Sequence, residues 1–364
     1  MKRAVKGRYR AGRRIGLALI VASLACLILL SFVSSASGPP LMVHFIDVGQ
    51  GDSCWLRLPN GDDVLIDGGK PQAGPTVVAY LQSHGVTDIE LMVATHGDAD
   101  HIGGLLDVLE AMPVDVAWLD SQTCTTQTCQ DFCQSLSAHD VVTAMVRMGE
   151  SYAWSAITAL ALNPSEPLYS DKNENSIVLR VSYWGIDFLL TGDAETGTEG
   201  RMQHSGLPLD AEILKVGHHG SNSSSSAAFL SAVSPQEAII SVGPNSYGHP
   251  RPEVLQRLAE VGATIWRTDE VGTVVVWTDG ITYAFGDELH SRAEAAFLPL
   301  IMLDSGIPRP TRTPTATMTV TGTATCTSTP TATPSPTETQ SPPADVQVVG
   351  GAHSLTRQGR TTTT

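Results

Sequence analysis

The amino-acid sequence predicts an α/β fold in which two β-sheets are covered by helices. Short apolar runs recur through residues 41–290, segments with helical periodicity lie between them, and turn-forming sequences separate the two. Alternation of strands and helices is typical of sheets with helices packed on their faces. The chain has 364 residues, of which 42% are hydrophobic, so it can bury a large core and is not disordered throughout.

The first half of this segment begins with hairpin strands. The turn sequences Gly-Gln-Gly-Asp and Pro-Asn-Gly-Asp separate the first apolar runs, as in β-hairpins. The elements expected here are strands at 43–48, 53–58 and 63–67, a helix at 76–84, a buried strand at 90–95 and a helix at 102–111.

The second half repeats the alternation of strands and helices. The elements expected here are strands at 176–181 and 186–190, a helix at 194–203, a strand at 211–216, a helix at 224–233, a strand at 238–242, a helix after Pro252, and strands at 264–267, 273–278 and 281–285.

The two ends of the chain differ in composition from the segment between them. Basic residues without any acid in residues 1–14 precede an uncharged apolar stretch, Ile15–Val33, which is the pattern of an export signal. The stretch is long enough to remain as a membrane anchor, and the small residues Ser34 and Ala36 also permit cleavage. Residues 308–343 contain 14 Thr and 8 Pro, a composition typical of an extended, solvated linker.

The predicted organisation therefore has five parts. An exported protein is expected, either extracellular or attached to the outer face of the cytoplasmic membrane through an uncleaved N-terminal segment. The parts are the export segment (1–40), a globular domain (41–290), a connector (291–307), the Thr/Pro-rich disordered linker (308–343) and a tail (344–364).

The globular domain is strongly acidic. Residues 41–290 contain 10 Lys and Arg against 33 Asp and Glu, a net charge of −23, and no cluster of basic residues. Proteins held to nucleic acid or to anionic lipid by bulk charge need a basic surface. The composition therefore argues against that mode of binding.

The six cysteines do not form a disulfide framework in a domain of this size. Export to an oxidising compartment would permit a small loop bridge within Cys124, Cys129 and Cys133. The spacing of these cysteines and His139 only faintly imitates a zinc knuckle, because it lacks the paired C-x-x-C.

The most informative motif is Thr95-His-Gly-Asp-Ala-Asp-His-Ile-Gly-Gly104, between an expected strand end and a helix start. Four ligand-type side chains, His96, Asp98, Asp100 and His101, alternate over six positions. Their convergence from one tight loop predicts a metal site, and the two glycines would let the backbone pass closely. A polar loop that caps a helix is the alternative.

Three further motifs fall at the ends of expected strands, where a rigid sheet can hold ligands. Each is a weak signal alone, since Asp-Gly after an apolar run is usually a turn. Their order along the chain strengthens the joint prediction. They are Ile66-Asp-Gly-Gly69, Thr191-Gly-Asp-Ala-Glu195 and Lys215-Val-Gly-His-His-Gly-Ser221.

Together with Phe45-Ile-Asp-Val-Gly-Gln-Gly-Asp-Ser53, Asn175-Ser176 and Gly248-His-Pro250, these motifs resemble the metallo-β-lactamase superfamily. Within it they are similar to the hydrolase domain of ComEC competence proteins and their stand-alone relatives. The resemblance covers residues 42–285. It implies an α+β sandwich of layers αββα, in which helices flank two mixed sheets and the metals lie at one edge between the sheets.

The resemblance also implies a ligand set. One divalent ion would be bound by His96 and Asp98, and a second by Asp100, His101 and His219, with Asp193 as the bridging carboxylate.

Other residues would support the chemistry. Asp67 matches the acid that supports the ligands from behind, while His218, Glu195 and, as a weaker candidate, His249 would contact substrate or transfer protons.

Asp98 stands where the superfamily more commonly has a histidine, and residues 173–176 offer no replacement for another. The implied set of three His and three Asp is harder than a typical zinc site, so Mn²⁺ becomes a rival to Zn²⁺. These departures also argue against β-lactam hydrolysis.

Two divalent ions about 3.5–4 Å apart would activate water at neutral pH and stabilise charge on the attacked centre, which suits phosphodiester hydrolysis. The predicted function is an exported dinuclear metal-dependent hydrolase, a phosphodiesterase or nuclease acting on a small phosphodiester or on DNA. The alternatives are hydrolysis of a cell-envelope ester or other small ester, and a non-catalytic, metal-stabilised binding module on a stalk. No protein partner is identifiable.

Overall fold

The computed structural model of the protein describes residues 40–120, 122–154 and 156–286. The apolar stretch 15–33, the connector, the linker and the tail lie outside these ranges, so their predicted roles stay predictions. Among the described residues, no helix combines the length and the apolar character that crossing a membrane requires.

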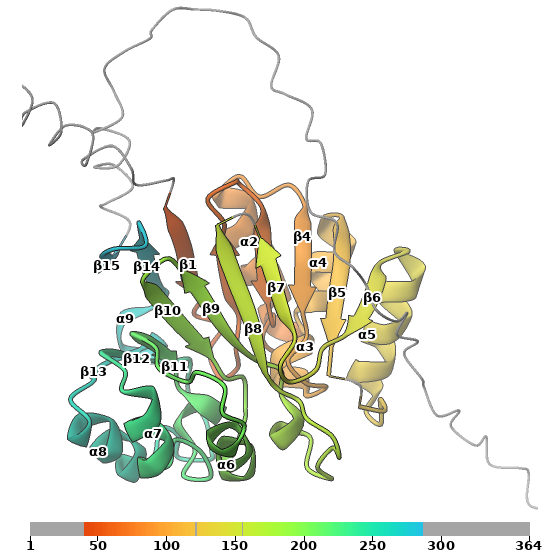
Figure 1. The fold of residues 1–364 in the computed structure, drawn as a ribbon. Helices are drawn as coiled ribbons and strands as arrows, with labels where there is room; N and C mark the ends of the chain where they lie inside the picture. The colour runs from red at the N-terminus through yellow and green to blue at the C-terminus, as the bar shows by residue number, and fades with distance from the viewer. Residues whose placement is uncertain (1–39, 121, 155, 287–364) are drawn as a thin grey trace, which may run out of the picture. The chain divides into compact units, whose positions relative to one another are not determined.

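Two mixed sheets carry the fold (Figure 1). The first sheet has the strand order β15-β14-β1-β2-β3-β4-β5-β6. Its strands are β1 (Leu41–Phe45), β2 (Cys54–Arg57), β3 (Asp63–Ile66), β4 (Ile89–Val93), β5 (Val114–Leu119), β6 (Val142–Met145), β14 (Val274–Thr278) and β15 (Tyr283–Phe285).

The second sheet has the strand order β13-β12-β11-β10-β9-β8-β7. Its strands are β7 (Ser151–Trp154), β8 (Ile157–Asn163), β9 (Val178–Tyr183), β10 (Ile186–Leu190), β11 (Ile213–Lys215), β12 (Glu237–Ile240) and β13 (Thr264–Arg267).

Helices lie on the outer side of each sheet, with α4 and α5 beside β5 and β6, and α7 and α8 beside β12 and β13 (Figure 1). The helices are α2 (Gly74–Ser83), α3 (Ala99–Ile102), α4 (Leu105–Ala111), α5 (Gln127–Ala138), α6 (Thr196–His204), α7 (Ala227–Val233), α8 (Pro252–Glu260) and α9 (Thr268–Val271), with the short turns η1 (Pro71–Ala73), η2 (Asn173–Asn175) and η3 (Gly217–Gly220).

Three apolar layers hold these elements together. Side chains such as Phe45 and Phe188 fill the space between the two sheets. Trp55 belongs to the layer between the first sheet and its helices, and Phe229 to the layer between the second sheet and its helices. The αββα sandwich that the resemblance implies is therefore confirmed.

The sequence prediction missed the elements between residues 114 and 163. Helix α5 buries only Phe132 and Leu136 fully, and strands β6 and β7 lie at the edges of their sheets. Because edge strands and polar helices bury few side chains, their hydrophobic periodicity is weak.

The helix expected at 102–111 is present over most of its range as α4, and the chain forms the short helix α3 before it, with Gly103 and Gly104 between the two. A Cβ atom on Gly104 would lie 2.0 Å from the carbonyl oxygen of Gly68. The glycine thus permits the close passage of two loops that the motif suggested.

The topology places the metal-site motifs at one edge. Strands β3 to β6 are parallel to one another, and so are β10 to β13. The carboxyl ends of parallel strands face the same way, and ligands of open α/β sheets gather at that edge. The loops after β3, β4, β10 and β11 carry Asp67, His96, Asp193 and His219 respectively.

Candidate metal centre

Asp193 lies at the middle of the predicted ligands. It follows β10 and is buried. Its Oδ1 is 3.2 Å from His101 Nε2, and its Oδ2 is 3.5 Å from His219 Nε2. A carboxylate with one oxygen toward each of two imidazoles is suited to the bridging role that the resemblance implies.

His96 and His101 come from the loop after β4 and from α3. Their ring centroids are 4.2 Å apart, and both residues are buried. His101 Nδ1 donates to Asp67 Oδ2 over 2.7 Å, which turns its Nε2 toward Asp193. Asp67 also accepts from the backbone and hydroxyl of Thr95 at 2.9 and 2.7 Å. Asp67 therefore orients a predicted ligand, as partners behind metal-binding histidines commonly do.

His219 reaches the same point from the second sheet. Its Nδ1 donates to the carbonyl oxygen of Ser241 over 2.9 Å, so its Nε2 faces Asp193. His218 and His219 have φ angles of 48° and 53°, in the left-handed region that side chains other than Gly rarely adopt. Strain of this kind is characteristic of functional sites.

Four buried atoms at this centre lack a hydrogen bond of good geometry among the described residues. They are Nε2 of His96, His101 and His219, and Oδ1 of Asp193. Buried polar atoms without partners are costly, and each such group in a native structure calls for an explanation. Three imidazole nitrogens and a carboxylate oxygen that converge in this way form a donor set that fits a divalent metal ion.

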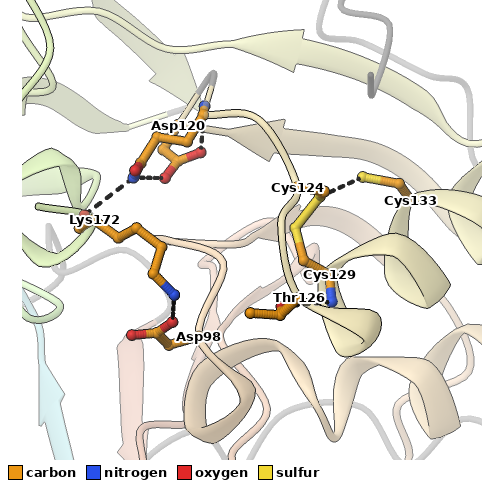
Figure 2. The surroundings of a disulfide bond; sticks show 8 residues. Asp98, Asp120, Cys124, Thr126, Cys129, Cys133 and Lys172 are labelled. Carbon is orange, nitrogen blue, oxygen red and sulfur yellow. Dashed lines mark hydrogen bonds and ion pairs between the residues drawn. A yellow bond between two sulfur atoms is a disulfide. The ribbon is translucent and has the colours of Figure 1, made fainter. Parts of the chain in front are cut away.

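The carboxylates of Asp98 and Asp100 lie at the more exposed rim of this centre. Asp98 Oδ2 is 3.7 Å from His96 Nε2, and Asp100 Oδ2 is 3.8 Å from His219 Nε2. Figure 2 shows Lys172 extended toward Asp98, where its ammonium group donates to Oδ1. All six predicted ligands thus lie close together, and their division between two ions stays a prediction.

The three residues predicted to act on substrate also lie beside the centre. His218 Nδ1 is 2.9 Å from Glu195 Oε1, and its Nε2 is 3.7 Å from Asp193 Oδ2. The ring of His249 stands edge-on to that of His218, with centroids 5.5 Å apart. Burial and the neighbouring His218 and His219 lower the pKa of His249 to about 4, so its imidazole is neutral at pH 7.

Charge coupling is strong in the metal-free centre. Burial alone would lower the pKa of His101 and raise that of Asp193. The mutual attraction of these groups outweighs burial, so the pKa of His101 is raised well above its ordinary value and that of Asp193 is held well below it. A bound cation would take over the neutralising role of the imidazolium.

Asp52 and Lys215 were missed as site residues by the sequence analysis. The two buried side chains form an ion pair of 2.7 Å, and Asp52 Oδ1 is 3.2 Å from His219 Nδ1. Burial raises the pKa of Asp52, but Lys215 and His219 outweigh it and hold the pKa below its ordinary value. A lysine inside the apolar run 213–216 is the signal that could have revealed the pair, because buried charges need partners.

The three cysteines of residues 124–133 lie next to the loop after β4 that contains His96, Gly97 and Asp98. A disulfide joins Cys124 to Cys129, within the range where a small loop bridge was expected (Figure 2). Cys133 Sγ lies 3.2 Å from Cys124 Sγ. A Cβ atom on Gly97, between His96 and Asp98, would lie 3.2 Å from Cys129 Sγ, so the bridge supports the metal-site loop from outside.

Residues 46–243 match the sequence model of the metallo-beta-lactamase superfamily. Curated relatives include ComE operon protein 3 of Bacillus subtilis, 28% identical over 72% of this chain and 36% of that protein. Competence protein ComA of Neisseria gonorrhoeae is 34% identical over 63% of this chain and 31% of that protein. Recombination protein 2 of Haemophilus influenzae is 31% identical over 70% of this chain and 31% of that protein. The chain spans about a third of the length of these relatives.

Among solved structures, the metallo-beta-lactamase fold protein YhfI of Bacillus subtilis is similar to this chain. It is 10% identical, with a TM-score of 0.47, over 65% of this chain and 100% of YhfI. The superfamily and the ComEC likeness expected from the motifs are thus confirmed by the sequence model and the curated relatives.

Proposed function

Because the chain belongs to the metallo-beta-lactamase superfamily, we propose that it is an exported hydrolase of phosphodiester bonds that uses two divalent ions, Zn²⁺ or Mn²⁺. One observation carries the proposal: three buried imidazole nitrogens without good hydrogen bonds converge on Asp193 at the carboxyl edge of both sheets. Divalent ions held there would activate water and offset the charge of a phosphate diester.

The protein's own residues supply orientation and proton transfer. Asp67 fixes the ring of His101 and the carbonyl of Ser241 fixes that of His219, so the ligands are aligned before an ion binds. Glu195 accepts from His218 Nδ1, which leaves His218 Nε2 directed toward the centre. In the protonated state His218 can therefore give a proton to the leaving oxygen, with Glu195 stabilising the imidazolium.

The size of the substrate is the second part of the proposal. The names of the curated relatives refer to competence and recombination, which favours DNA. The net charge of −23 on residues 41–290 favours a small diester, because phosphate contacts with basic residues supply much of the affinity for nucleic acid. We propose a small phosphodiester as the preferred substrate.

Hydrolysis by the metal-loaded chain tests this proposal. The metal-free protein is given Mn²⁺ or Zn²⁺ and assayed with bis(p-nitrophenyl) phosphate, a simple carboxylic ester, double-stranded DNA and a β-lactam. Asp193→Ala should abolish hydrolysis, whereas Asp115→Ala, which replaces an exposed acid of β5 outside the motifs, should have no effect.

Each outcome selects one function. Cleavage of the diester but not of DNA supports the proposal, and faster cleavage of DNA supports a nuclease. Cleavage of the carboxylic ester alone supports the small-ester hydrolase. Metal binding without hydrolysis of any substrate supports the non-catalytic binding module. Export is tested separately, since a protease added to intact cells should degrade the domain.

A further inference from the structure

Lys172 occupies an unusual place beside the candidate metal centre. Among the Lys and Arg residues that the structure describes, it alone forms an ion pair with a predicted metal ligand, Asp98. It directly precedes η2, in the region where the superfamily's commoner pattern would place another histidine and this sequence has none. Lys172 thus places a positive charge in the segment where the commoner pattern has a metal-binding histidine.

The backbone of Lys172 is held by hydrogen bonds, and its side chain is held through the contact with Asp98. Its carbonyl oxygen accepts from Gln122 Nε2 over 3.0 Å and from the backbone of Asn175 over 2.9 Å. Asn175 is buried, and its side-chain amide accepts from the backbone N–H of Tyr169 and donates to the carbonyl oxygen of Tyr169, at 2.8 Å each. The lysine side chain is 35% exposed, and its four-carbon stem would let the ammonium group move if the contact with Asp98 were broken.

A cation at the position of His96 and Asp98 would compete with this arm. Asp98 directs Oδ1 to Lys172 and Oδ2 toward His96, so binding of a divalent ion by Asp98 would displace the ammonium or weaken its contact. At the other position, none of the described Lys or Arg side chains forms an ion pair with Asp100, the acid grouped there with His101 and His219. The two positions should therefore fill with unequal affinity.

We propose that the ammonium group of Lys172 neutralises Asp98 while the His96–Asp98 position holds no metal ion. When an ion binds Asp98, the ammonium group is released and binds a phosphate oxygen of the substrate. The inference rests on the proposed function and names a further substrate-binding residue for it. It also explains how a domain with few basic residues can recognise a phosphate, because the charge is delivered only at the loaded centre.

Two binding measurements on the full chain test the proposal without any turnover. Calorimetric titration of the metal-free protein with Mn²⁺ should resolve a tight and a weak step. In Lys172→Met the weak step should tighten about two- to fivefold, the range for a partly exposed ion pair. The affinity of the metal-loaded protein for inorganic phosphate should fall about tenfold in the same variant, as for the loss of one charged hydrogen bond.

Matched variants separate this role from a structural one. Lys70→Met also removes one positive charge, but Lys70 lines a different cavity with Asp47 and Gln72, so neither affinity should change. Lys172→Arg keeps the charge and should retain phosphate binding. The proposal is overturned if Lys172→Met weakens the binding of metal, or if it leaves both affinities unchanged while its thermal stability matches the wild type. Absence of hydrolysis with every substrate would refute the proposed function without altering these two binding curves.

Discussion

At the scale of single residues, the centre depends on how buried charges are paired. Asp193 attracts both His101 and His219, and Asp67 and Asp52 hold the far sides of these rings. In the metal-free protein the pKa values of both histidines are raised, because these carboxylates outweigh the effect of burial. A raised pKa favours the protonated imidazole, whereas a bound ion would need the free nitrogen.

Metal loading should therefore release protons from these histidines. A raised pKa in the folded state stabilises the metal-free fold below the ordinary histidine pKa, and this contribution is lost as the pH rises through the folded value. Metal affinity should accordingly increase from pH 6 to pH 8. Calorimetry in two buffers of different ionisation enthalpy measures the released protons, and equal heats in both buffers would contradict the prediction.

The buried pair of Asp52 and Lys215 should dominate the stability of this edge. Lys215→Met removes the lysine partner of the buried Asp52 and leaves His219 as its charged neighbour, so the free energy of unfolding should fall toward the lower end of about 3–5 kcal/mol. The double variant Asp52→Asn with Lys215→Met removes both charges and should recover most of this loss. Urea unfolding of the three proteins measures the difference, and a double variant no more stable than the single one would refute the pairing argument.

At the scale of elements, short loops at the carboxyl edge position the ligands. Helix α3 is only one turn long and carries Asp100 and His101, and the glycines after it allow the chain to turn into α4 against the loop that follows β3. The geometry of the ligands therefore depends on a close backbone contact as well as on the ligand residues.

Gly104→Ala should disturb this contact and lower both stability and metal affinity. Its Cβ would meet the Gly68 carbonyl oxygen at 2.0 Å, and crowding of this kind costs about 1–3 kcal/mol. Gly200→Ala is the matched control, because this helical glycine in α6 has no heavy atom within 4 Å of the added Cβ. It should be neutral or stabilise the protein by up to about 1 kcal/mol. Thermal unfolding with and without Mn²⁺ checks both variants.

At the scale of the whole molecule, the acidic surface decides how a polyanion meets the site. Residues 41–290 carry a net charge of −23, and the positive charges near the centre include Lys172, Lys215 and, close to His249, Arg251. Lys215 is buried in its pair with Asp52, so of the two lysines only Lys172 can reach a substrate. Long-range attraction of DNA is therefore not expected.

The salt dependence of binding should reflect this balance. For a protein that neutralises many phosphates, affinity for DNA falls steeply as salt increases. Here the affinity of the metal-loaded wild-type protein for a DNA duplex should stay constant or rise between low and moderate salt, because salt screens the repulsion between the acidic surface and the DNA phosphates. Fluorescence anisotropy measures this slope, and a steep fall in affinity would reveal a basic binding surface and favour the nuclease.

Much of the fold, and the position of the candidate ligands at strand ends, could be predicted from sequence because each motif is local. Asp67 directly follows its strand in the structure, and His96, Asp193 and His218 each lie three residues after the end of theirs. Elements with little burial, such as α5 and the edge strands β6 and β7, carry too little periodicity to be recognised.

By itself, the sequence determined the candidate ligand residues, their order and the superfamily, because these depend on residue identity and spacing within short segments. Only the tertiary structure decided which side chains meet across the sheets. Lys172 lies far along the chain from Asp98, and Lys215 from Asp52, so no local pattern joins them. The pairings form when the two sheets pack face to face and their carboxyl edges converge. A buried charge has little contact with water, so it depends on the oppositely charged side chain that the fold places beside it.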